Sequence, residues 1–109
     1  MNNISQPAFK PNPASTVALN AATTTANVQV QAGQASRHVR VRNAGAVDAF
    51  IAFGIDNTVA ATLPVNGGAA GSMPISAGAV EIFSAPYEFV AAITASGTAQ
   101  LYFTPGEGL

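Results

Sequence analysis

Residues 36–45, SRHVRVRNAG, contain most of the basic side chains in this chain. Arg37, Arg40 and Arg42 are three of the four Lys and Arg residues, and His38 is the only histidine. In an extended strand His38, Arg40 and Arg42 point to one side, and the intervening valines point to the other. This basic row is consistent with a solvated strand face, a docking surface or a phosphate-binding site.

The three hypotheses differ in which group binds the arginine guanidinium groups. On a solvated face, Arg40 or Arg42 forms an ion pair with Glu81 or Glu88 on an adjacent strand. On a docking surface, the same groups bind carboxylates of a partner protein in bidentate fashion. Phosphate binding ranks last, because the chain has a net charge of −1 and the row lacks supporting lysines and interleaved aromatic residues. We therefore expect no nucleic-acid partner.

Catalysis finds little support among the other polar residues. A nucleophile needs an adjacent base, and the single imidazole, His38, lies in a row of arginines whose like charge disfavours its protonated form. The segment GGAAGS at residues 67–72 lacks the Lys-Ser/Thr and the helix of a phosphate-binding loop. No pair converges for glycosidase chemistry among the carboxylates Asp48, Asp56, Glu81, Glu88 and Glu107. With no cysteine and one histidine, the sequence predicts a non-enzymatic protein without metal, cofactor or small-molecule substrate.

The composition indicates a component of an assembly. Only 8% of the residues are charged, against about 25% in ordinary soluble domains. Hydrophobic residues make up 49% of the chain, which is a poor surface for an isolated monomer. No apolar run reaches the roughly 18 residues of a membrane-spanning helix, and the first residues lack the apolar core of a signal peptide. We expect a homo-oligomer that binds other proteins and no membrane.

Short runs rich in Val, Ile, Phe and Thr, separated by turn residues, predict strands throughout residues 15–104. The predicted strands are 16–20, 27–31, 37–43, 48–53, 59–63, 72–75, 79–84, 88–94 and 98–104. This pattern predicts an all-β fold, a single-domain antiparallel β-sandwich or jelly roll of about eight strands. The segment DAFIAF at residues 48–53 is apolar on both faces, with Phe50 on one and Phe53 on the other. It is expected to be a central strand or to lie at an interface.

The two ends of the chain differ from this sandwich domain. Residues 1–14 contain three prolines and are predicted to be an extended arm. The arm is either a flexible tail or a contact arm that becomes ordered on a neighbouring subunit, with Phe9 as its anchor beside Lys10. Pro105 and Gly106 are expected to end the last strand, which leaves residues 105–109 as a C-terminal tail.

Three segments carry a resemblance to a known class of proteins. VRVRNAGAVDAFIAFG at residues 39–54, AGAVEIFSAP at 77–86 and VAAITASGTAQLYFTPGEGL at 90–109 resemble segments of small virion structural proteins of tailed bacteriophages and prophages. The resemblance implies a compact β-rich protein present in many copies and made in the host bacterial cytoplasm. Capsid decoration (cement) proteins are the most similar group, and they sit on the outer capsid surface. The implied partners are the major capsid protein and further copies of the chain, and no catalytic residues carry over.

Two alternatives remain open. The same fold also suits a tail, neck or fibre component of the virion. A carbohydrate-binding β-sandwich is the alternative of another class, with Tyr87 and Tyr102 as the only tyrosines and no tryptophan. The residues predicted to bind a partner are Phe9, Lys10, Arg37, His38, Arg40, Arg42, Phe50 and Phe53.

Overall fold

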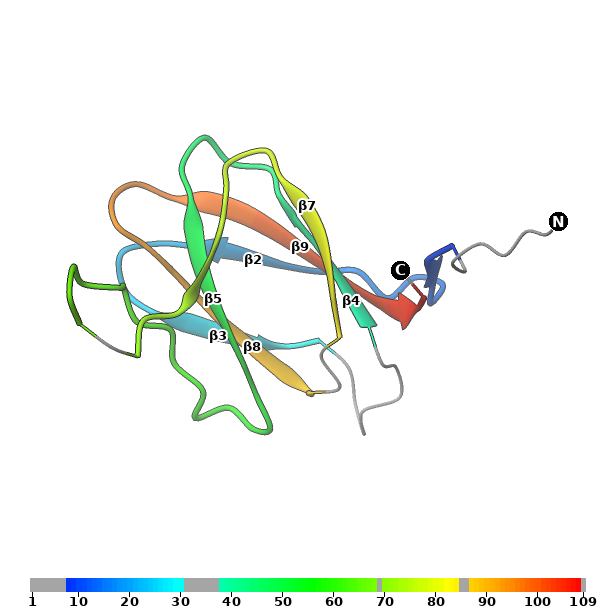
Figure 1. Cartoon of the computed structure of the whole chain (residues 1–109). Coiled ribbons are helices and arrows are strands. Elements are labelled where there is room, and N and C mark those ends of the chain that lie inside the picture. Colours follow the sequence, from blue (N-terminus) through cyan, green and yellow to red (C-terminus); the bar gives the residue numbers. More distant parts are fainter. Residues whose placement is uncertain (1–7, 31–37, 69, 85–86, 109) are drawn as a thin grey trace, which may run out of the picture.

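The computed structural model describes residues 8–30, 38–68, 70–84 and 87–108 (Figure 1). Within these ranges the regular elements are all strands, which confirms the predicted all-β fold. The nine strands are β1 (Lys10–Pro11), β2 (Val17–Ala21), β3 (Ala26–Gln29), β4 (His38–Asn43), β5 (Ala49–Gly54), β6 (Met73–Ile75), β7 (Val80–Ser84), β8 (Phe89–Thr94) and β9 (Ala99–Glu107).

The strands form two antiparallel sheets packed as a sandwich. Sheet A has the order β1–β9–β4–β7, and β2 pairs with β9 on the same side as β1. Sheet B has the order β3–β8–β5–β6. The chain changes sheets repeatedly, since β4, β7 and β9 lie in sheet A while β5, β6 and β8 lie in sheet B (Figure 1).

The core lies between the sheets and follows the alternation that the sequence predicts. Val39 and Val41 of β4 are fully buried, and so are Leu101 and Phe103 of β9. They join a single cluster with apolar residues of sheet B, namely Ala49, Ile51, Ile75, Val90 and Ala92. Burial of this surface at about 25 cal/mol per Å² is the main force that holds the sheets together.

Both faces of β5 are apolar, and other parts of the chain cover both of them. Ile51 faces the core, while Ala91 of the neighbouring β8 lies on the outer face of sheet B and is still fully buried. The long segment between β5 and β6 provides the cover. The Asn27 side chain of β3 donates to Asn57 O at 3.0 Å, and Ala61 of this segment is buried. The prediction that residues 48–53 form a central strand is confirmed.

The predicted strand at residues 59–63 is wrong, because this stretch belongs to the covering segment and forms no strand. Two of its backbone N–H groups bind side chains instead of a neighbouring strand. Ala61 N donates to the Thr25 hydroxyl at 2.8 Å, and Thr62 N donates to the Ser72 hydroxyl at 2.9 Å. The β-branched and apolar residues that resemble a strand here serve to cover sheet B.

The last strand also runs further than predicted. An end before Pro105 is wrong, because β9 continues to Glu107 and pairs there with β1. Asn12 lies opposite Pro105, and the Asn12 N–H donates to Pro105 O at 3.0 Å. The return hydrogen bond to the Asn12 carbonyl is missing, because proline has no N–H. The Asn12 carbonyl instead accepts a hydrogen bond from the Ser15 hydroxyl at 2.7 Å. The turn between β1 and β2 therefore supplies the donor that the proline lacks.

Candidate functional site

The outer face of sheet A carries the arginines that the sequence singles out. Arg40 and Arg42 are exposed, whereas the alternating valines of β4 are buried. β4 lies between β7 and β9, so each arginine has a neighbour on both sides. Arg40 lies opposite Ile82 of β7 and Thr104 of β9. The predicted orientation of the row is confirmed for these two residues, and Arg37 lies outside the described residues.

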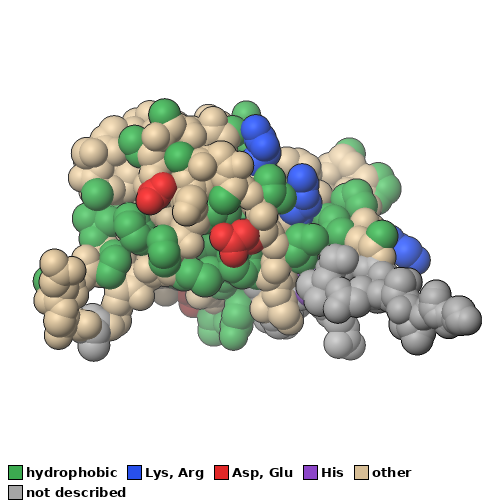
Figure 2. All heavy atoms as spheres, turned by 45° about the horizontal axis from the view of Figure 1, so that its top comes forward, with side chains coloured by type: hydrophobic (Ala, Val, Ile, Leu, Met, Phe, Trp, Pro, Cys, Tyr) green, Lys and Arg blue, Asp and Glu red, His purple; other side chains and the backbone are tan. Residues whose placement is uncertain are grey.

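Apolar and uncharged polar side chains surround the arginines on this face. Arg42 lies opposite Val80 and Tyr102, each of which is 39% exposed. The Thr104 hydroxyl forms a hydrogen bond with the Thr16 hydroxyl at 2.9 Å. We call this set the arginine face: Arg40, Arg42, Val80, Ile82, Tyr102 and Thr104. On the face that Figure 2 shows, charged side chains are sparse and are separated by hydrophobic and uncharged residues.

The predicted ion pairs of the arginines with Glu81 or Glu88 on adjacent strands are wrong. Glu81 is directly opposite Val41, so it belongs to the other face of sheet A. Glu88 precedes β8 in sheet B, where it accepts a hydrogen bond from the Gln29 side chain at 3.2 Å. None of the residues that form the arginine face is acidic, so within the described part of the chain the cross-strand neighbours of Arg40 and Arg42 supply no carboxylate.

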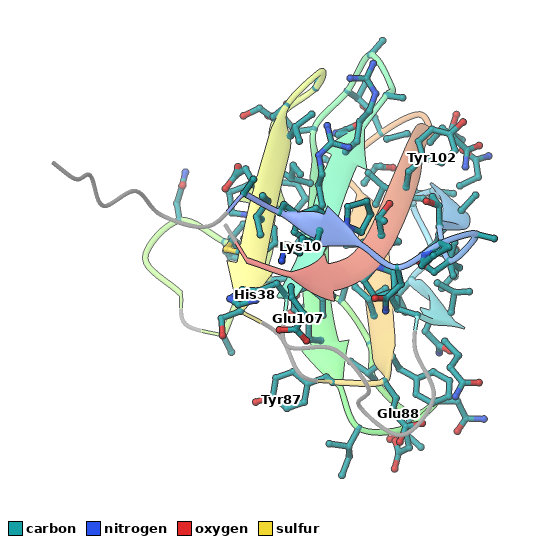
Figure 3. The ribbon with its side chains drawn as sticks, turned by 90° about the vertical axis from the view of Figure 1, so that its right-hand side faces the viewer. Lys10, His38, Tyr87, Glu88, Tyr102 and Glu107 are labelled. Atoms are coloured by element: carbon teal, nitrogen blue, oxygen red, sulfur yellow. The ribbon has the colours of Figure 1, made fainter. Side chains whose placement is uncertain are left out.

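His38 forms a hydrogen bond with the backbone of its own chain. The ring is half-buried, and Nδ1 accepts a hydrogen bond from Gly108 N at 3.2 Å. In this arrangement the proton of the neutral imidazole sits on Nε2. Figure 3 shows His38 close to Lys10 and Glu107, at the end of sheet A where the described chain starts and ends. The histidine therefore holds the C-terminal segment in place.

The described part of the N-terminal arm lies along its own domain. Lys10 is opposite Glu107 and Pro11 is opposite Gly106. Phe9 is half-buried, and a Cβ added to Gly106 would come within 2.7 Å of its ring. Phe9 thus packs on β9 of the same chain, and its predicted contact with a neighbouring subunit stays a prediction.

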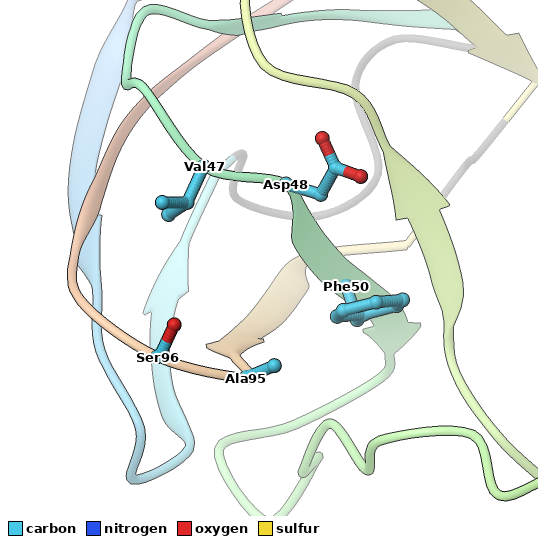
Figure 4. A pocket seen from close by; sticks show the side chains of 5 residues that line it. All are labelled: Val47, Asp48, Phe50, Ala95 and Ser96. Carbon is cyan, nitrogen blue, oxygen red and sulfur yellow. The ribbon is translucent and has the colours of Figure 1, made fainter.

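The two phenylalanines of β5 lie on different faces of sheet B. Phe53 packs against the core, with its ring centroid 6.0 Å from that of Phe83. Phe50 lines an open hollow of about 390 Å³ between the start of β5 and the β8–β9 turn (Figure 4). Asp48 is the only titratable residue that lines it, and its carboxylate already accepts a hydrogen bond from Ala77 N at 2.9 Å. The hollow therefore offers no pair of groups for acid–base chemistry.

The covering segment carries the most exposed apolar side chains. Ile55 is 67% and Val65 is 71% exposed. Between them, Asp56 accepts hydrogen bonds from the Thr58 hydroxyl at 2.5 Å and from Thr58 N at 3.0 Å. These hydrogen bonds, the side-chain one first, lower the pKa of Asp56 below its ordinary value. This is local turn chemistry, since Asp commonly binds the backbone two residues further on.

The remaining expectations concern metals, membranes and carbohydrate. Across the described ranges, no group of three His, Cys, Asp or Glu side chains is close enough to hold a metal ion. The same residues include no helix of the length and apolar character that a membrane crossing needs. Figure 3 shows Tyr87 and Tyr102 far apart, so the two tyrosines do not form one binding platform.

Comparison of the chain with protein-family models, with curated proteins and with solved structures gave no match.

Reasoning from the sequence did not identify Asn43 as structurally important, although it is buried at the end of β4. Its only signal in the sequence is a polar residue at an inward position of an alternating strand.

Proposed function

We propose that this chain is a non-enzymatic structural protein of a phage virion that decorates and stabilises the outer capsid surface. It would be made in the host bacterial cytoplasm and would bind the major capsid protein and further copies of itself. The observation that supports this role is the arginine face, where two guanidinium groups with no acidic partner among the described residues lie beside partly exposed apolar side chains. A tail, neck or fibre location is the second candidate, because the same face would serve there.

The arginine face has the composition of a protein docking surface. Interfaces are enriched in Arg and Tyr and depleted of Lys, Glu and Asp. Arg42 is flanked by Val80 and Tyr102, both partly exposed, so docking would bury apolar area around the charge. An acidic group on the partner would then form charge-assisted hydrogen bonds in a site from which water is excluded. Many such contacts, repeated by the symmetry of a shell, add up through avidity.

Copy number distinguishes the two virion locations. Quantitative mass spectrometry of purified particles measures the ratio of this chain to the major capsid protein. A ratio near one, or a simple fraction of it, supports capsid decoration. A dozen copies or fewer support the tail, neck or fibre location, and complete absence from particles contradicts both.

Removal of the arginine charges tests the docking face directly. We expect Arg40→Gln combined with Arg42→Gln to fold normally and to bind particles at least about tenfold more weakly, because charge-assisted hydrogen bonds contribute about 1.5–3 kcal/mol each. The matched control is Thr23→Glu with Thr24→Glu, which lowers the net charge by the same two units at exposed positions between β2 and β3. Equal loss in both double variants would show that net charge, and not the arginine face, sets the affinity.

A further inference from the structure

β7 is an edge strand of sheet A, and one side of its backbone has no pairing partner among the described residues. Among the described strands it pairs with β4 alone. Asn43 N donates to Ala79 O at 2.9 Å, which fixes the residues of this ladder that face β4. The N–H and C=O of one residue point to the same side of an antiparallel strand, so Glu81 and Phe83 direct theirs to β4. The alternate residues direct theirs away from the sheet: Val80, Ile82 and Ser84.

This edge carries fewer of the devices that block strand pairing than β1, β3 and β6 do. Proteins protect edges with Pro, with charged side chains, with bulges or with a covering loop. β6 contains Pro74, and Ser72 beside it donates its N–H to Thr62 O. β1 contains Pro11, and the covering segment binds the Asn27 side chain of β3. β7, with the sequence VEIFS, has neither Pro nor Lys, and Glu81 is its one charged residue. The bulge at Gly78 and Ala79, which both bind Asn43, ends before Val80, and the register with β4 is regular from there to Ser84.

We propose that β7 is a dimerisation edge that pairs antiparallel with β7 of a second copy of this chain, with the twofold axis at Ile82. In this register each Ile82 faces its counterpart, and each Val80 faces Ser84 of the other copy. All three outward-directed residues then exchange hydrogen bonds with the second copy. Val80, which is 39% exposed, would gain apolar cover.

The charges on β7 select this register over its neighbours. A pairing that keeps the hydrogen bonds must match outward-directed residues with one another, so registers differ by steps of two residues. One such step places Glu81 directly opposite Glu81 of the second copy, and like charges at that position are destabilising. The opposite step leaves fewer outward-directed residues paired. In the Ile82-centred register Glu81 faces Phe83, and no like charges meet.

The dimer would extend the arginine face. A twofold axis between antiparallel edge strands runs perpendicular to the sheet, so both outer faces point to the same side. Arg40 and Arg42 of both copies would then share one continuous surface, which makes each attachment bivalent. The pairing itself does not depend on the virion role, because it follows from the edge of β7 alone.

Amide hydrogen exchange of the full chain tests the pairing at single-residue level. Exchange of the Glu81 and Phe83 amides is expected to be slow at every protein concentration. Exchange of the Val80, Ile82 and Ser84 amides is expected to slow as the concentration rises through the dimer dissociation constant measured by analytical ultracentrifugation. A chain that stays monomeric, or a dimer in which these three amides still exchange rapidly, would overturn the proposal.

Substitutions at Ile82 separate the backbone contribution from the side chain. The N–H of Ile82 faces away from β4, so Ile82→Pro removes an intermolecular donor and no bond within the chain. We expect at least about tenfold weaker dimerisation for Ile82→Pro, and near-normal dimerisation for Ile82→Thr, which keeps the N–H and the β-branch. Equal dimerisation by both variants would overturn the proposal.

Disulfide trapping tests the register even where Ile82→Pro fails to fold. The chain has no cysteine, so a single introduced cysteine reports one distance. Directly opposite residues have Cα atoms about 5.5 Å apart, within reach of a disulfide. Ile82→Cys should therefore form covalent dimers on mild oxidation. Ser84→Cys should not, because its counterpart lies about 13 Å further along the strands. Equal crosslinking of the two variants contradicts the Ile82-centred register.

Discussion

Asn43 is a fully buried amide that ties the two sheets together. Its Nδ2 donates to Val47 O at 3.0 Å and to Ile75 O at 3.1 Å, and its Oδ1 accepts from Gly45 N at 2.9 Å. Ile75 belongs to β6 in sheet B, whereas Asn43 ends β4 in sheet A. A buried polar side chain with every group satisfied specifies one arrangement of its surroundings. Asn43 therefore helps to fix how β6 sits against sheet A.

Asn43→Ala should be among the most destabilising substitutions in the chain. It removes three hydrogen bonds and leaves the carbonyls of Val47 and Ile75 without this donor. We expect a loss of about 2–4 kcal/mol in the free energy of unfolding, measured by urea denaturation. The control is Asn20→Ala on the exposed side of β2, with an expected change within about 0.5 kcal/mol. Similar losses for both variants would contradict the role assigned to Asn43.

At the residue level, the sequence predicts orientation better than partners. The alternation in β4 correctly places the valines inside and Arg40 and Arg42 outside. It does not predict that Glu81 lies on the opposite face, because that depends on the register with β7. The hydrogen bond between His38 and Gly108 joins residues seventy positions apart. Only the folded chain brings such groups together.

At the level of elements, eight of the predicted strands correspond to β2–β9, and β1 is not predicted. The false strand at residues 59–63 and the early end of β9 share one physical cause. Residues 59–63 have strand-like composition, but their backbone groups bind the side chains of Thr25 and Ser72. Pro105 normally ends a strand, but the Ser15 hydroxyl supplies the missing donor to Asn12. In both places a side-chain hydroxyl replaces a backbone partner. Strand propensity depends on residue type alone and does not predict such side-chain hydrogen bonds.

The close approach of β1 to β9 depends on Gly106. A Cβ at this position would collide with Lys10 O, a backbone atom, and with the Phe9 ring. We expect Gly106→Ala to detach β1 while the sandwich stays folded, with exchange of the Lys10 and Asn12 amides about tenfold faster by mass spectrometry. Thr104→Ala, on the same strand and outside the β1 contact, should leave these amides unchanged. Unaltered exchange in Gly106→Ala would mean that β1 tolerates the added methyl group.

At the scale of the whole molecule, the two proposed contacts, the arginine face and the β7 edge, depend on different forces. Four Lys and Arg and five Asp and Glu residues create a weak overall field. Long-range attraction therefore contributes little, and each contact depends on its own local groups. The arginine face offers guanidinium groups, which salt screens, whereas the β7 edge offers backbone hydrogen bonds and apolar side chains.

Salt should therefore separate attachment to particles from dimerisation. The screening length falls from about 10 Å at 0.1 M salt to about 3 Å at 1 M. Over this range we expect particle binding, measured by co-sedimentation, to weaken several-fold. The dimer dissociation constant, measured by analytical ultracentrifugation in the same buffers, should change by less than about twofold. A dimer that dissociates in salt together with the particle complex would mean that charged groups, and not the β7 backbone, hold the two copies together.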